Sequence, residues 1–339
     1  MTKTKIMATL ATDRATHGFI SMMRRAGIDS VRINSAHVDP VSLRGMIASV
    51  RAVDPGIRIL MDTKGPEIRT TYAPTEISLA EGDTIEMASS ADGLPSDRRR
   101  IHIAVADMDR YVNPGMKISL DDGEIELEVT DVDRQGIITL RTIRGGLLGS
   151  RKTVSLDTEE LPPLPAVSVR DRENIEAALE AGIDMIAHSF VREAADVRAV
   201  RKLTEGSGVT LYAKIECRAA LRNMEEILGA ADGLLVARGD LGTACPLSEI
   251  PAIQHEIISR CRRVGKPSIL ATQILQTMIS NPIPTRAELS DVALAVMEGA
   301  DMLLLCGETA LGAYPEECIE IMRQTIESVE KHNLRCRID

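Results

Sequence analysis

The chain has 339 residues, of which 44% are hydrophobic and 27% are charged, and its formal net charge is −10. This length allows a large core and about two domains, or one barrel that carries an insertion. The acidic balance disfavours a nucleic-acid partner, and the lack of an apolar run near ~20 residues or of a signal-peptide pattern predicts a cytoplasmic protein without a membrane span.

Short apolar runs alternate with stretches of helical period along most of the chain. Eight runs have the length of strands, at residues 5–9, 30–34, 57–62, 184–189, 210–216, 232–238, 267–272 and 301–306. Helices are predicted between them, most clearly at residues 172–181, 193–204, 219–230, 253–264 and 286–298. Eight strands that alternate with helices predict an α/β fold of the (β/α)8 type, a TIM barrel.

The interval from residue 68 to residue 163 breaks this rhythm. It contains short alternating runs and turn signals such as Asn113-Pro-Gly115 and Asp121-Asp-Gly123, without a convincing helix. We therefore predict a small all-β barrel domain at residues 68–163, inserted after the third strand of a catalytic domain formed by residues 1–67 and 164–339. Because catalytic loops lie at the C-terminal face of such a barrel, the insertion is expected to be a mobile lid; a structural decoration is the alternative.

The strongest local signal is the stretch from Met61 to Arg69, which reads Met-Asp-Thr-Lys-Gly-Pro-Glu-Ile-Arg. It follows the third apolar run directly, and unpaired charges are rarely left inside a core, so this stretch is expected to belong to a site. A solvated loop is the alternative. Polar residues also gather where other predicted strands end, at residues 32–34, 214–216, 238–240, 272–273 and 307–309. In a TIM barrel these ends meet at one face.

Lys214 and Glu216 are two residues apart, so a regular strand points both side chains to the same face. Asp240 follows the adjacent strand. Two carboxylates can hold one Mg²⁺ or Mn²⁺ through hard oxygen ligands, with water and substrate oxygens completing the octahedron. We prefer this metal site, and a structural ion pair between Lys214 and Glu216 is the alternative.

Six motifs stand in one order along the chain: Asp62-Thr-Lys-Gly-Pro-Glu-Ile-Arg69, Ala213-Lys-Ile-Glu216, Val236-Ala-Arg-Gly-Asp-Leu-Gly242, Ala271-Thr-Gln273, Pro284-Thr-Arg-Ala-Glu288 and Gly307-Glu-Thr-Ala310. Together they resemble the motifs of the pyruvate kinases, from residue 3 to about residue 331. The resemblance implies a phosphotransferase that moves a phosphoryl group from phosphoenolpyruvate to ADP, giving pyruvate and ATP in the final step of glycolysis. It also implies Mg²⁺ or Mn²⁺ and K⁺ as cofactors, a β-barrel domain after the third strand, and a homo-oligomer.

The resemblance implies roles for individual residues. Lys214 would stabilise the transferring phosphoryl group, Arg32 would grip phosphate, and Thr272 would lie near the carbon that is protonated. Glu216 and Asp240 would hold the divalent metal. The remaining expected positions are the substrate-binding Ala237, Arg238 and Gly239, the nucleotide-binding Asn34, His37, Arg69 and Lys152, and the K⁺ ligands Asn34, Asp62 and Thr63.

The chain departs from the family pattern at a few positions. Ala36 stands where the family has a serine that binds K⁺, so K⁺ is expected to stimulate activity with weaker affinity. The chain stops soon after its eighth predicted helix, so the usual C-terminal regulatory domain is expected to be absent. Two other functions remain open, a metal-dependent pyruvate-enolate lyase or aldolase and a catalytically weak regulatory paralogue. The lid, Lys214 and the region of Arg69 favour the kinase.

Overall fold

The computed structural model describes residues 4–90, 92–158 and 160–335, and of residues 37 and 333–335 it describes the backbone only. Eight parallel strands close into a barrel in the order β1-β16-β15-β14-β13-β12-β3-β2. They are β1 (Lys5–Thr9), β2 (Ser30–Asn34), β3 (Arg58–Asp62), β12 (Met185–His188), β13 (Thr210–Ile215), β14 (Gly233–Ala237), β15 (Ser268–Ala271) and β16 (Met302–Leu305). Each coincides with a predicted run, so the TIM-barrel prediction is confirmed.

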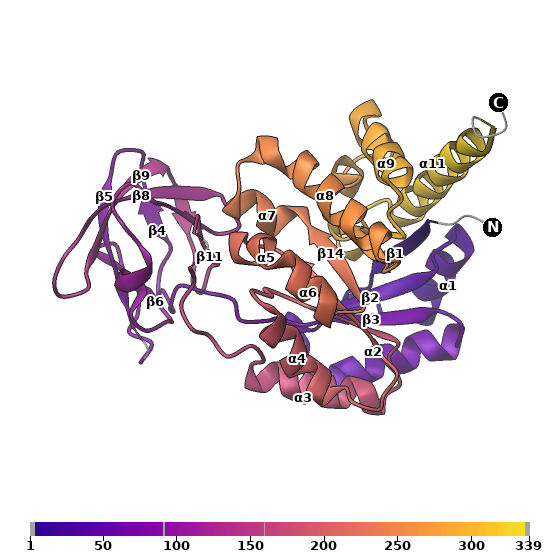
Figure 1. Ribbon diagram of the computed structural model, residues 1–339, viewed down its shortest axis with the longest axis horizontal. Helices are drawn as coiled ribbons and strands as arrows, with labels where there is room; N and C mark the ends of the chain where they lie inside the picture. The colour runs from indigo at the N-terminus through magenta and orange to yellow at the C-terminus, as the bar shows by residue number, and fades with distance from the viewer. Residues whose placement is uncertain (1–3, 91, 159, 336–339) are drawn as a thin grey trace.

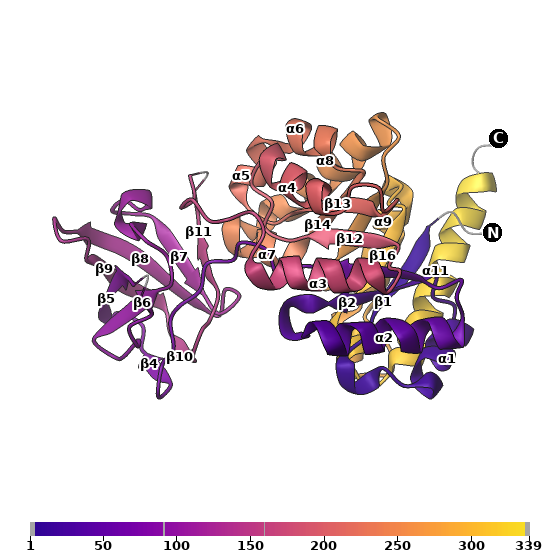
Figure 2. The same cartoon turned by 90° about the horizontal axis from the view of Figure 1, so that it is seen from below.

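Helices surround the barrel, as Figures 1 and 2 show. They are α1 (His17–Ala26), α2 (Pro40–Val53), α3 (Val169–Glu180), α4 (Ala194–Leu203), α5 (Arg218–Arg222), α6 (Met224–Ala230), α7 (Arg238–Ala244), α8 (Ile250–Arg263), α9 (Arg286–Glu298), α10 (Gly307–Ala310) and α11 (Pro315–Arg335). The helix predicted over residues 219–230 is divided into α5 and α6 at Asn223. The side-chain amide of Asn223 donates to the Arg192 carbonyl at 2.9 Å. The helical period of the sequence does not reveal this tertiary contact. None of the described helices is long and apolar enough to cross a membrane.

The insertion is all-β, as expected. Its strands are β4 (Ile77–Leu79), β5 (Thr84–Ser89), β6 (Arg100–Ile103), β7 (Lys117–Leu120), β8 (Ile125–Val132), β9 (Ile138–Arg144), β10 (Gly146–Leu148) and β11 (Val154–Leu156). They pair as a six-stranded sheet in the order β11-β7-β8-β9-β5-β6 and as a two-stranded ladder of β10 and β4, rather than as one closed cylinder. Buried side chains from Ile68 to Leu156 form a core that is separate from the barrel's.

The barrel has two packed layers of apolar side chains. One layer lies between the strands and the surrounding helices. The other fills the barrel interior, where Met7, Leu60, Tyr212, Leu235 and Leu304 are almost fully buried. Since side chains alternate along a strand, Tyr212 inside the barrel places Lys214 on the same inward face of β13, one step nearer the C-terminal mouth. The packed interior below therefore forms the floor of the mouth.

The insertion lies at one end of the barrel in both ribbon views, with β11 next to α7. A direct contact joins the two parts there, because the Thr243 hydroxyl at the end of α7 donates to Ser155 Oγ of β11 at 2.9 Å. Since α7 follows the C-terminal end of β14, the insertion lies over the mouth of the barrel.

Candidate active site

Polar side chains from β2, β3 and β13 meet at the C-terminal mouth of the barrel. The Lys214 ammonium lies 2.8 Å from Glu216 Oε1 and 3.2 Å from Asp62 Oδ1. Asp62 Oδ2 in turn lies 2.7 Å from Arg32 Nε. The register of β2 and β3 pairs Asn34 with Asp62, so the two strand ends are level. The parallel strands thus bring together residues that are more than 150 positions apart.

The charges of this cluster stabilise one another against the cost of burial. Burial disfavours a charged Lys214, but the Asp62 and Glu216 carboxylates outweigh this effect and raise the pKa of the ammonium. Burial likewise disfavours a charged Asp62, and Lys214 together with Arg32 lowers the pKa of that carboxyl below its usual value. Lys214 is therefore a cation, and only 8% of its surface is exposed. A fixed positive charge of this kind is suited to an anionic group that enters the mouth.

Glu216 and Asp240 form the pair of carboxylates expected to hold a divalent metal. Burial raises the pKa of Glu216, and the neighbouring Asp240 carboxylate raises it further, although Lys214 opposes both effects. Burial also raises the pKa of Asp240. Two adjacent carboxyl groups with raised pKa values can both ionise when a further cation lies between them.

The two oxygens of Glu216 have different partners. Oε2 accepts a hydrogen bond of 2.6 Å from the Phe190 amide. Oε1 is buried and forms an ion pair of 2.8 Å with the Lys214 ammonium, which is the alternative that the sequence analysis left open, and no other described residue donates to it. The described residues contain no cluster of three or more histidine, cysteine or acidic side chains that could hold a metal. Glu216 and Asp240 are two neighbouring carboxylates, the ligand type that a hard cation prefers, and water or substrate oxygens would have to complete its coordination.

The segment where β14 enters α7 carries the residues expected to bind a small carboxylate through their backbone, and two of its polar groups already have partners. The Arg238 side chain binds both oxygens of Asp291 at 2.8 Å and donates to the Thr272 carbonyl at 2.7 Å, so its guanidinium is committed to the scaffold. The Gly239 amide donates to Thr272 Oγ1 at 2.8 Å. Thr272 has a φ of 69°, an unusual conformation for a β-branched residue, which indicates a constrained position. Thr272, Ala237 and Gly239 are therefore adjacent, as the sequence analysis expected.

The three residues expected to bind K⁺ are close together but already engaged. Asn34 Oδ1 accepts from the Ala36 amide at 3.1 Å. Thr63 Oγ1 lies 2.9 Å from His188 Nδ1 and accepts from the Ser189 amide at 3.1 Å. The two oxygens of Asp62 pair with Lys214 and with Arg32. A potassium ion at this position would have to share these oxygens.

Of the residues expected to bind nucleotide, Asn34 lies at the mouth, whereas Arg69 and Lys152 belong to the inserted segment. Arg69 pairs with Glu67, with Nε at 2.6 Å from Oε2, and also donates to the Arg151 carbonyl. The Lys152 ammonium lies 2.8 Å from Asp121 Oδ2 within the insertion. The side chain of His37 lies outside the described part of the chain. Neither Arg69 nor Lys152 belongs to the cluster around Lys214, so the structure divides the predicted site into two groups.

Sequence reasoning missed Ser189, which lies at the centre of the cluster. Its hydroxyl accepts from the Lys214 ammonium at 2.8 Å and donates to Asp62 Oδ1 at 3.0 Å. The signal was present, since Ser189 directly follows β12 and strand C-terminal ends carry functional groups in this fold. Asp171 was also missed. Its carboxylate accepts from the Lys64 amide at 2.9 Å and from the Gly65 amide at 3.2 Å, and so fixes the turn that leads into the insertion.

Comparison with known proteins shows that this chain is similar to the pyruvate kinases. Residues 1–319 match the family model described as the barrel domain of pyruvate kinase. A pyruvate kinase from Methylorubrum extorquens is 40% identical over 98% of this chain and 70% of its own length. One from Geobacillus stearothermophilus is 42% identical over 95% of this chain and 56% of its own length, and one from Agrobacterium vitis is 38% identical over 97% and 69%. The chain thus spans between about half and about two thirds of these relatives.

Proposed function

The chain belongs to the pyruvate kinase family, and from that premise we propose that it transfers a phosphoryl group from phosphoenolpyruvate to ADP, giving pyruvate and ATP. The observation that supports the proposal is the buried Lys214 ammonium, which lies 2.8 Å from the buried Glu216 carboxylate at the mouth of the barrel. Phosphoryl transfer needs positive charge around the oxygens of the group in flight, and these two residues supply a fixed cation and a ligand for a second one. A pyruvate-enolate lyase has no phosphoryl group that would require Lys214.

Metal dependence accompanies membership of this family, and we propose Mg²⁺ or Mn²⁺ at Glu216 and Asp240. When bound, the ion would neutralise charge on substrate oxygens and hold phosphoenolpyruvate in place. Glu216 would bind through Oε1, because Oε2 is occupied by the Phe190 amide. Potassium at Asn34, Asp62 and Thr63 is a further part of the proposal, with weak affinity because these oxygens already have partners.

The residues of the mouth then divide the work. Lys214 stabilises the charge that develops on the phosphoryl oxygens and on the enolate that remains after transfer. Arg32, held by Asp62 and by the Thr9 hydroxyl at 3.1 Å, grips the phosphate. The backbone from Ala237 to Gly239 binds the carboxylate, and Thr272 lies beside the carbon that water protonates. Asp62 and Ser189 keep Lys214 oriented before the substrate arrives.

We propose that residues 68–163 form a lid domain on a catalytic domain of residues 1–67 and 164–339. The lid would bring Lys152 and Arg69 to the nucleotide together with Asn34 and His37. Closure over the mouth would exclude water, which otherwise competes with ADP for the phosphoryl group. Cytoplasmic localisation and a homo-oligomeric state complete the proposal.

The test is an assay of ADP-dependent pyruvate formation from phosphoenolpyruvate, with Mg²⁺ and K⁺ present. We expect activity in the wild-type protein, and loss of most turnover together with weaker Mn²⁺ binding in Glu216→Gln. Pyruvate formation that does not depend on ADP would instead indicate a lyase. No activity with intact Mn²⁺ binding would support the regulatory paralogue and refute the proposal.

A further inference from the structure

The four residues that follow β12, Ser189 to Arg192, contact both the candidate metal ligand and the two connections of the lid. No motif of the sequence analysis includes this segment. The role that we give this segment toward Glu216 rests on the metal site of the proposed function.

The first contact is with Glu216. The Phe190 amide donates to Glu216 Oε2 at 2.6 Å, which leaves Oε1 as the oxygen that faces the mouth. Phe190 has a φ of 52°, a left-handed conformation that is a genuine outlier for a bulky residue. Such strained backbones persist only where their surroundings hold them. The conformation that aims this amide at Glu216 therefore has to be held by the packing of Phe190.

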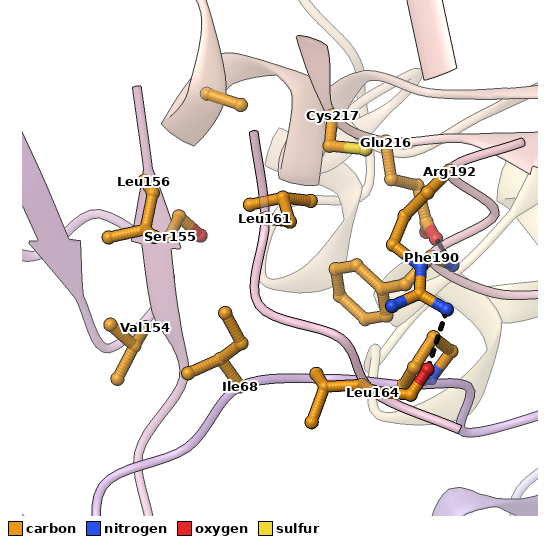
Figure 3. Close-up of a pocket in the computed structure, with 12 residues that line it drawn as sticks. Ile68, Val154, Ser155, Leu156, Leu161, Leu164, Phe190, Arg192, Glu216 and Cys217 are labelled. Carbon is orange, nitrogen blue, oxygen red and sulfur yellow. Dashed lines mark hydrogen bonds between the residues drawn. The ribbon is translucent and has the colours of Figure 1, made fainter. Parts of the chain in front are cut away.

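The surroundings of Phe190 are a pocket between the barrel and the lid that is partly open to solvent. Figure 3 shows the Phe190 ring extending into this cavity. Ile68, from the first lid connection, and Leu161 and Leu164, from the second, line the same cavity. Lid strand β11 contributes Leu156 on another wall. Movement of either connection thus changes the space around the ring.

The neighbours of Phe190 tie the same segment to both connections. On the first, Gly65 has a φ of 70°, and a Cβ added there would lie 2.3 Å from the Ser189 carbonyl oxygen, so only glycine allows this close approach. On the second, Arg192 donates to the Leu164 carbonyl at 2.8 Å while both its Nε and Nη2 bind Asp196. The short segment from Ser189 to Arg192 therefore contacts both lid connections and Glu216.

We propose that Phe190 is a positioning residue for the metal ligand Glu216 and links the orientation of that carboxylate to the lid connections. The ring, which lines the pocket together with residues of both connections, holds the strained backbone. The backbone amide in turn fixes Oε2 and presents Oε1 to the metal. Lid position and metal affinity are then coupled through Phe190.

The test measures Mn²⁺ affinity by electron paramagnetic resonance on the full chain, with folding checked by circular dichroism. Partners that orient metal ligands typically change metal affinity by ~10- to 100-fold when they are lost, so Phe190→Ala should weaken Mn²⁺ binding by about 10-fold or more. Phe190→Leu, which refills the cavity, should recover most of the affinity. The matched control Leu156→Ala opens another wall of the cavity and should leave Mn²⁺ affinity within about two-fold. A folded Phe190→Ala protein with wild-type Mn²⁺ affinity would overturn the positioning role.

The link to the lid is tested by combining Phe190→Ala with Leu164→Ala. We expect Leu164→Ala to weaken Mn²⁺ binding in the wild-type background and to have no further effect in the Phe190→Ala background, because the two residues act through one path. Equal effects in both backgrounds, or none in either, would overturn the link. Failure of the proposed function looks different: Glu216→Gln would then bind Mn²⁺ as tightly as the wild type, and the metal site itself would be wrong.

Discussion

Replacement of Lys214 by methionine tests the catalytic proposal most directly. The side chain length is similar, and the change removes one charge that lies 2.8 Å from Glu216 Oε1, 3.2 Å from Asp62 Oδ1 and 2.8 Å from Ser189 Oγ. A preorganised charge in a water-poor site is typically worth ~3 to 5 kcal/mol in the transition state. At ~1.36 kcal/mol for each factor of ten, turnover should fall by ~10²- to 10⁴-fold.

The mutant is expected to remain folded, since each carboxylate left behind keeps a partner. Asp62 still pairs with Arg32 at 2.7 Å, and Glu216 still accepts from the Phe190 amide. Mn²⁺ affinity should not fall, because the ammonium repels a divalent cation at Glu216. Phosphoenolpyruvate binding should change far less than turnover, and ketonisation of enolpyruvate should persist in part, since that step involves no phosphoryl transfer.

Turnover is measured by pyruvate formation at saturating substrates, and binding is measured separately by calorimetry. Lys266→Met is a suitable control, because Lys266 binds the Leu228 and Ala231 carbonyls just before β15, at the opposite end of that strand from the mouth. A Lys214→Met protein with normal turnover but poor phosphoenolpyruvate binding would make Lys214 an anchor for the ground state, and the mechanism would be wrong.

Three further predictions concern K⁺, the lid and pH. Potassium should stimulate the rate of pyruvate formation with weak affinity, because Asn34, Asp62 and Thr63 already have partners; equal rates in K⁺ and tetramethylammonium would count against the site. Replacing residues 68–163 by a short linker should abolish phosphoryl transfer and leave the barrel's circular dichroism intact, since the two cores are separate, and retained kinase activity would show that the insertion is decorative. Burial lowers the pKa of His188 to about 4, so the folded state prefers the neutral ring, and stability should be lost as pH falls from about 6.5 to about 4. Urea unfolding should show a loss of unfolding free energy on the order of 3 kcal/mol in the wild type but not in His188→Gln. The same pH dependence in both proteins would show that His188 is not its cause.

The sequence by itself determined the architecture and predicted which polar residues meet at the mouth of the barrel. Apolar runs of strand length and helical periods are properties of neighbouring residues, so they located all eight barrel strands and the insertion. The two-residue spacing of Lys214 and Glu216 placed both side chains on one face, and the ion pair of 2.8 Å confirms that placement. These features depend on local geometry that a single strand already carries.

Only the tertiary structure decided which polar groups at the mouth bind one another. Closure of the barrel brings Ser189 to Lys214 and Asp62, and brings the Phe190 amide to Glu216. It also turns the Arg238 guanidinium to Asp291. These distances join separate strands and helices, and they depend on strand register and on a strained φ that no periodicity encodes. A buried carboxylate can accept only a few hydrogen bonds. The donors that bind it come from several strands and helices, so its partners are fixed only when the barrel closes and brings all of these donors together.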